Sequence, residues 1–199
     1  MERYELILDE EQDIDGVQAI SLVSDPAIES NFIALNKDKI QLAAVNDEKR
    51  ILMGAALIPN KSIYRRDGNL EYEVFFTDET VRKASELFFK NANQSKTTLE
   101  HVIDLKGNTI VESWIKEDNV HDKSARYAID VPIGSWVVSM KIEDDATYKM
   151  AKDGLIRGFS IEGYFIDKMV QANKVKEEEN EDDKLAEEIM DLIKNVTNK

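Results

Sequence analysis

One uninterrupted apolar run, ILMGAALI at residues 51–58, constrains the fold more than any other segment. It ends at Pro59-Asn60, which is a turn signal, and its length fits a β-strand. A strand with no polar residue on either side has to be covered on both faces. We therefore expect a buried strand within a barrel or a sandwich.

Shorter apolar runs predict further strands on both sides of this one. We expect strands at residues 4–9, 71–76, 126–129 and 133–142, and a last strand from 154 to about 167. Residues 97–115 are expected to form two strands around Lys106-Gly107-Asn108, because this tripeptide is a hairpin signature. Residues 10–50 show no sustained period, so their structure is left open.

Two helices are predicted between the strands. Thr77 has the residue type of an N-cap, acids follow it, and apolar residues recur at helical spacing to about Lys90. Residues 144–152 form the second predicted helix, and Gly154 is placed to end it. Beyond residue 170 an acidic run precedes an apolar helical stripe, formed by Leu185, Ile189, Leu192, Ile193 and Val196.

These elements predict an α+β fold that is rich in β-structure. We divide the chain into an N-terminal strand and irregular arm at 1–47, a β-rich domain at 48–170, and an acidic linker with an amphipathic helix at 171–199.

The composition excludes several functions. The sequence has no cysteine, which rules out disulfides, thiolate metal sites and a cysteine nucleophile. A formal net charge of −14 argues against nucleic acid and anionic membranes as partners. No apolar run reaches the length of a membrane span, and the N-terminus lacks the layout of a signal peptide. We expect a soluble cytosolic protein that needs no cofactor.

The sequence contains two histidines, His101 and His121. His121 lies in a polar segment and is expected to be an exposed loop residue. His101 lies among apolar residues on a predicted strand, and no second histidine shares its strand face, so a metal site is not expected. In the predicted hairpin the partner of His101 is Glu112, Ser113 or Trp114, depending on the length of the turn. Glu112 in that position would orient the imidazole.

Ser160 is the second candidate catalytic residue. On a strand it shares one face with Glu162 and Tyr164, while Phe159 and Ile161 form the apolar face. Ser160 is therefore expected to point to a surface or a cleft, and Glu162 competes with Glu112 for the histidine. The flanking glycines permit the close approach of another backbone.

These residues resemble a known pattern. Phage capsid maturation (prohead) proteases carry a histidine on one strand and, later in the chain, a glycine-rich strand with the nucleophilic serine. Leu99-Glu100-His101 and Asp153–Gly163 match this pattern in order and spacing. More narrowly, the chain resembles the XkdF type of phage serine protease over about residues 48–167, through blocks at 51–65, 72–76, 110–115, 132–142 and 157–163.

The resemblance implies a fold similar to that of herpesvirus assemblins, a closed and mainly antiparallel barrel with flanking helices. It implies Ser160 as the nucleophile and His101 as the general base. Assemblins use a second histidine as third member, but His121 precedes Ser160 here. An acid is therefore expected in that role, either Glu112 or Glu162.

Other positions remain open under this resemblance. The backbone N–H groups of Arg157 and Gly158 are implied donors to the oxyanion. Ser113 and Ser139 are rival nucleophiles, and Ser113 is near His101 in sequence.

The implied function is a prohead serine endopeptidase that cleaves scaffold and capsid proteins and also itself. It would act inside the assembling procapsid, in the cytoplasm of the bacterial host. Scaffold and major capsid protein are the expected partners, with the portal and a second copy of the chain as further candidates. The acidic run after residue 170 is a candidate region for self-cleavage.

Two readings compete with this one. A non-catalytic capsid assembly factor on the same barrel predicts that Ser160 and His101 lie far apart or fail to form a hydrogen bond. A β-barrel binding module would use Trp114, Trp136 and Tyr164 to line a ligand groove.

Overall fold

The computed structural model describes residues 2–8, 16–28, 33–34 and 49–169. The chain divides into two compact units, Met1–Met169 and Val170–Lys199. All of the described residues belong to the first unit. The predicted acidic linker and C-terminal helix lie outside the described residues.

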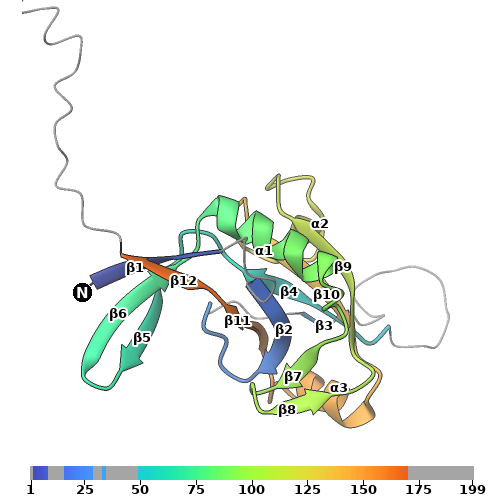
Figure 1. Cartoon of the computed structure of the whole chain (residues 1–199). Coiled ribbons are helices and arrows are strands. Elements are labelled where there is room, and N and C mark those ends of the chain that lie inside the picture. Colours follow the sequence, from blue (N-terminus) through green and yellow to red (C-terminus); the bar gives the residue numbers. More distant parts are fainter. Residues whose placement is uncertain (1, 9–15, 29–32, 35–48, 170–199) are drawn as a thin grey trace, which may run out of the picture. The chain divides into compact units, whose positions relative to one another are not determined.

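The strands form three four-stranded sheets (Figure 1). The first has the order β12 (Ile166–Met169), β1 (Glu2–Ile7), β6 (Leu70–Phe75) and β5 (Ile63–Asp67). The second has the order β3 (Ile33–Ala34), β4 (Ile51–Leu57), β10 (Trp136–Lys141) and β9 (Thr109–Ile115). The third has the order β11 (Gly158–Tyr164), β2 (Gly16–Val23), β7 (Thr97–Leu99) and β8 (Ile103–Leu105).

The predicted class, rich in β-structure with few helices, is confirmed. The helices are α1 (Asp78–Lys90), α2 (Lys123–Arg126) and α3 (Asp145–Lys152). Most strand pairs are antiparallel, whereas β1 with β6 and β2 with β7 are parallel. The described strands do not close into a barrel, so the assemblin-like closure stays a prediction.

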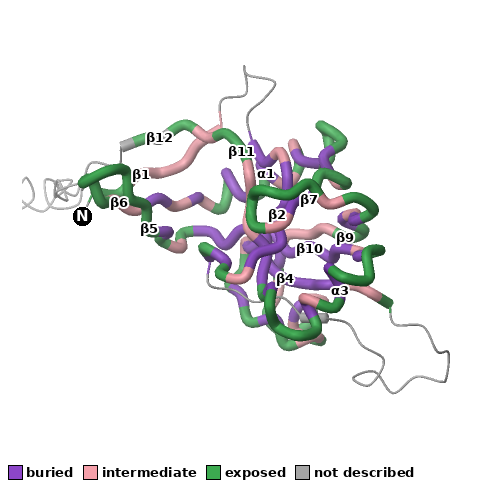
Figure 2. Tube along the Cα trace, turned by 90° about the horizontal axis from the view of Figure 1, so that it is seen from below, coloured by how far each residue is buried: buried purple, intermediate pink, exposed green. Residues whose placement is uncertain are grey.

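The core confirms the two most apolar predicted strands. From Leu52 onward β4 is buried, and so is β10 up to Met140. These two strands pair side by side in the middle of their sheet. Figure 2 shows the buried positions gathered where β2, β4 and β10 lie. Helix α1 adds Phe88, whose ring packs edge-on against that of Trp136 at a centroid distance of 5.4 Å.

Helix α1 begins and ends as its local sequence dictates. The Thr77 hydroxyl accepts a hydrogen bond from the Thr80 N–H at 3.3 Å, as an N-cap does. At the other end Ala92 has a φ of 55°, its N–H bonds to the Phe89 carbonyl, and the Asn93 N–H bonds to the Phe88 carbonyl. This pair of bonds is a Schellman motif, with alanine where glycine is usual.

The second helix is also confirmed. The Asp144 carboxylate caps α3 by accepting the Thr147 N–H at 2.6 Å, and Gly154 follows the helix with a φ of 73°.

Two local predictions are wrong. Residues 97–115 do not form one hairpin around Lys106-Gly107-Asn108. Instead β7 and β8 pair through a turn at residues 100–102, and β9 pairs with β10. The predicted strand at 126–129 is the end of α2 and a turn, in which Ala128 has a φ of 55°.

The segment at residues 16–23, for which no structure was predicted, forms β2. It pairs with β11 on one side and β7 on the other. All of its residues are buried except Gln18, which is partly exposed. The described parts of residues 1–47 therefore belong to the same compact unit as residues 49–169.

Candidate active site

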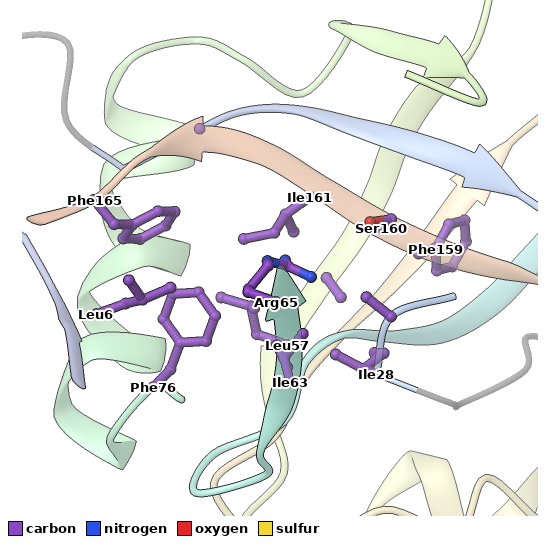
Figure 3. A pocket seen from close by; sticks show the side chains of 13 residues that line it. Leu6, Ile28, Leu57, Ile63, Arg65, Phe76, Phe159, Ser160, Ile161 and Phe165 are labelled. Carbon is purple, nitrogen blue, oxygen red and sulfur yellow. The ribbon is translucent and has the colours of Figure 1, made fainter. Parts of the chain in front are cut away.

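Ser160 lies on β11, directly opposite Ser21 of β2. Side chains of directly opposed residues share one face of an antiparallel pair. Ser21 is itself opposite Thr98 of β7, so the three hydroxyls form a row across the sheet. Ser21 is buried, whereas Ser160 is partly exposed and lines a cavity (Figure 3). Neither His101 nor Glu162 lines this cavity, so the prediction that Ser160 points to a cleft stays a prediction.

His101 lies in the turn between β7 and β8, not on a strand as predicted. Glu100 and His101 have φ values of 50° and 59°, and the Val102 N–H donates to the Leu99 carbonyl at 3.1 Å. Residues other than glycine, asparagine and aspartate seldom adopt this conformation, and it costs energy that the surrounding contacts have to offset. The turn is held because the His101 N–H donates to Ser21 Oγ at 3.0 Å.

The His101 ring contacts Glu162, two residues beyond Ser160 on β11. His101 Nδ1 lies 3.1 Å from Glu162 Oε1, and the Thr98 hydroxyl also donates to that oxygen. The exposed fractions of the two side chains are 41% for His101 and 31% for Glu162, so water reaches the pair. The carboxylate favours the tautomer with a proton on Nδ1, which leaves Nε2 as a proton acceptor.

Ser160 Oγ and His101 Nε2 form no hydrogen bond to each other in the part of the chain that is described. They are brought near each other indirectly. Ser21 is opposite Ser160 and holds the His101 backbone, while Glu162 shares the strand of Ser160 and holds the His101 ring.

Position 163, directly after Glu162, requires a glycine because the backbone of β2 passes close to it. A Cβ there would lie 2.2 Å from the Gly16 carbonyl oxygen, which is shorter than any allowed contact. The register of β11 against β2 also shifts between Glu162 and Gly163. The expectation that this glycine permits the close approach of another backbone fits the structure.

Glu112 has other partners. It accepts hydrogen bonds from Lys123 and from Ser139 Oγ, the latter at 2.5 Å. These two bonds lower the pKa of the Glu112 carboxyl, with the Lys123 bond the larger cause. Because β9 pairs with β10 and not with β7, the hairpin that would have placed Glu112 opposite His101 does not exist.

The rival serines have structural partners as well. Ser113 Oγ accepts the Trp136 Nε1–H at 2.8 Å, and Ser139 is buried and donates to Glu112. Neither hydroxyl contacts a histidine among the described residues. Trp136 is buried in the core, where it cannot line a ligand groove.

The remaining predicted positions are the two oxyanion donors and the second histidine. The Arg157 N–H donates to the Val23 carbonyl at 2.8 Å, which argues against its use as an oxyanion donor. Gly158 pairs with Val23 at the start of β11, and its role stays a prediction. His121 is exposed, and its ring contacts Asp118 Oδ2 at 3.2 Å.

Sequence reasoning missed two residues of this group, Ser21 and Thr98. Each has a hydroxyl on a strand beside β11, and each supports the His101–Glu162 pair. Only the pairing of β2 with β11 and β7 reveals them. The five apolar residues among positions 17–23 were the available signal for β2.

Two findings hold for the residues that the structure describes. No helix among them is long and apolar enough to span a bilayer. They also contain no cluster of three or more histidine, aspartate or glutamate side chains that could hold a metal ion.

A serine, a histidine and a carboxylate that orients the histidine are the groups that a serine hydrolase uses. The family described as "Putative phage serine protease XkdF" matches residues 39–170, and the chain belongs to this family. No curated protein and no solved structure is significantly similar to the chain.

Proposed function

We propose that the protein is a serine endopeptidase of phage capsid maturation, with Ser160 as nucleophile, His101 as general base and Glu162 as the acid that orients His101. One observation carries this proposal. The contact between His101 Nδ1 and Glu162 Oε1 measures 3.1 Å, and Glu162 comes from the same strand face as Ser160. The chain's membership of a phage serine protease family supports it.

The chemistry then follows from the ring orientation. His101 Nε2 takes the proton of Ser160 Oγ, and Oγ attacks the carbonyl carbon of the scissile bond. His101 passes that proton to the leaving amine, the C–N bond breaks, and an ester on Ser160 remains. Water attacks the ester after giving a proton to Nε2, and that proton returns to Ser160 as the acid product leaves. The Gly158 N–H is the proposed donor to the oxyanion.

The proposal requires His101 Nε2 and Ser160 Oγ to approach each other when substrate binds. Catalytic hydrogen bonds are often long or misaligned without substrate and tighten in the complex. The β7–β8 turn is exposed to solvent, with Val102 exposed to 82%, so the protein core does not have to move for this approach.

The proposed substrates are the phage scaffold and major capsid protein, with the chain itself as a further substrate. The portal and a second copy of the chain are further proposed partners. The proposed place of action is the interior of the assembling procapsid, within the bacterial host. The family supports a phage protease, and the acidic segment at residues 171–184 is the proposed region of self-cleavage.

One observation favours a second candidate, a non-catalytic capsid assembly factor. That candidate predicts that Ser160 and His101 fail to form a hydrogen bond, and none joins them among the described residues. The His101–Glu162 contact would then serve only to hold the β7–β8 turn.

Co-expression with the neighbouring scaffold and capsid proteins separates the two candidates. Intact masses of all partners are compared for wild type, Ser160→Ala, His101→Ala and, as matched control, Ser113→Ala. We expect shortened products with wild type and Ser113→Ala, and none with Ser160→Ala or His101→Ala. Intact partners in a stable complex with wild type would instead support the assembly factor.

A further inference from the structure

The strand that carries Ser160 is the last one in its sheet. β11 pairs with β2 along one edge, and no described strand pairs with its other edge. β5 is likewise the last strand of its own sheet. Unpaired strand edges present rows of N–H and C=O groups that can bind an extended chain.

A cavity of about 220 Å³ lies along the unpaired edge of β11 (Figure 3). Ser160 and Ile161 line it from β11, and Ile63 and Arg65 line it from β5. Apolar side chains make up most of the remaining wall, among them Leu57, Phe76 and Phe165. An apolar cavity of roughly 150 Å³ holds a benzene molecule, so this one has room for a leucine, methionine or phenylalanine side chain.

Arg65 adds a positive charge to the lining of this cavity. Figure 3 shows its guanidinium between Ile161 and Leu57, directed toward β11. Its only hydrogen bond in the described part of the chain goes to the carbonyl of Tyr64 at 3.3 Å, and no carboxylate pairs with it there. Arg65 is exposed to solvent, so its guanidinium is accessible to a carboxylate from another chain and can bind it through two parallel N–H donors.

We propose that the groove between the unpaired edge of β11 and the end of β5 binds the substrate polypeptide as an added β-strand, with a large apolar side chain in the cavity and an acidic side chain on Arg65. This inference rests on the proposed function, because Ser160 lines the cavity and fixes where the scissile bond lies. It defines a substrate class, extended segments in which a large apolar residue and an acid lie close to the cleaved bond.

Cleavage profiling tests the substrate class. A mixture of peptides from a digested proteome is incubated with wild type, Arg65→Glu and Ala27→Phe, since Ala27 also lines the cavity. The matched controls are Arg66→Glu on the same strand and Ala146→Phe on the surface of α3. Neither control residue lines the cavity.

We expect wild type and both controls to prefer a large apolar residue at one position and an acid at a second. Arg65→Glu should lower cleavage of the acid-containing sites by roughly ten-fold or more, because it replaces attraction with repulsion. Ala27→Phe should shift the apolar preference toward smaller side chains. Profiles of Arg65→Glu and Ala27→Phe that match wild type would overturn the groove while leaving the protease intact.

A binding measurement keeps the groove testable without catalysis. A short fluorescein-labelled peptide of alternating leucine and glutamate is titrated with Ser160→Ala, with and without Arg65→Glu, and followed by fluorescence anisotropy. We expect Arg65→Glu to weaken binding by roughly ten-fold or more and Arg66→Glu to leave it unchanged. Binding that depends on Arg65 without any cleavage by wild type would uphold the groove and reject the proposed function. Equal binding by Arg65→Glu would reject the groove.

Discussion

At the scale of single residues, Glu162 and Glu112 have the same side chain but different roles, because their partners differ. Glu162 accepts from an imidazole and from the Thr98 hydroxyl. Glu112 accepts from the Lys123 ammonium and from Ser139. An imidazole has two nitrogens, so a carboxylate beside one of them decides what the other can do. An ammonium offers no such choice, and Glu112 is therefore a structural ion pair.

Glu162→Gln should slow the reaction of Ser160 strongly. A neutral amide no longer selects the tautomer with a proton on Nδ1, and loss of this selection costs roughly a hundred-fold to ten-thousand-fold in serine proteases. The rate at which a fluorophosphonate phosphonylates Ser160, with fluoride as the leaving group, measures the effect. Glu112→Gln serves as the control, and a similar rate loss in both variants would contradict the role of Glu162.

The stability of the 118–122 loop should depend on acid pH through Asp118. Hydrogen bonds from the His121 and Val120 backbone N–H groups lower the pKa of the Asp118 carboxyl to about 2. Because folding lowers this pKa, protonation favours the unfolded chain. The contribution of Asp118 is therefore complete above about pH 4 and is lost as the pH falls toward 2.

Asp118→Asn tests this, because an amide oxygen keeps the acceptor without titrating. We expect the free energy of unfolding of this variant to fall less steeply between pH 4 and pH 2 than that of wild type. Chemical denaturation across this range provides the measurement. Asp130→Asn, which removes an exposed carboxylate from a nearby position, should keep the wild-type slope. Identical slopes for Asp118→Asn and wild type would contradict the assignment.

At the scale of elements, local signals decide what can be predicted. Helix α1 was predicted from Thr77 to about Lys90, because caps and helical spacing are written in neighbouring residues. The β7–β8 turn was missed because Glu100 and His101 occupy positions where glycine, asparagine or aspartate is usual. The hairpin was predicted at Lys106-Gly107-Asn108 instead, because this tripeptide has the residue types of a turn.

The end of α1 carries a removable strain. Ala92 adopts the left-handed conformation that closes the Schellman motif, which costs a residue with a Cβ about 1–2 kcal/mol. Ala92→Gly removes that cost but gives the unfolded chain more freedom. The net expectation is a gain of about 0.5–1 kcal/mol in the free energy of unfolding.

Thermal and denaturant unfolding of Ala92→Gly provide the check. Ala146→Gly is the control, because Ala146 lies in the first turn of helix α3 without a left-handed conformation, so the variant should only lose stability. Destabilisation of both variants by the same amount would show that Ala92 carries no strain.

At the scale of the whole molecule, pairings between distant segments determine the site. The sequence supported Ser160, His101 and a shared face for Ser160 and Glu162. It did not reveal that β2 separates β11 from β7, since no local pattern records which strands pair. The choice between Glu112 and Glu162 depended on that pairing, and so did the recognition of Ser21.

The central place of β2 predicts slow hydrogen exchange. At residues 20–22 it lies between two neighbouring strands, and its side chains are almost all buried, so these amides should exchange only through large-scale opening. We expect protection at residues 20–22 close to that of β10. Strand β5, an exposed edge, should exchange much faster. Exchange of β2 as fast as that of β5 would contradict the sheet order.

The most direct test of the whole account is which serine reacts. Wild-type protein is treated with a fluorophosphonate, which labels only activated hydroxyls, and the adduct is located by peptide mass spectrometry. We predict a single adduct on Ser160, absent in Ser160→Ala and strongly slowed in His101→Ala. An adduct on Ser113 or Ser139, or none at all on folded wild type, would contradict the account.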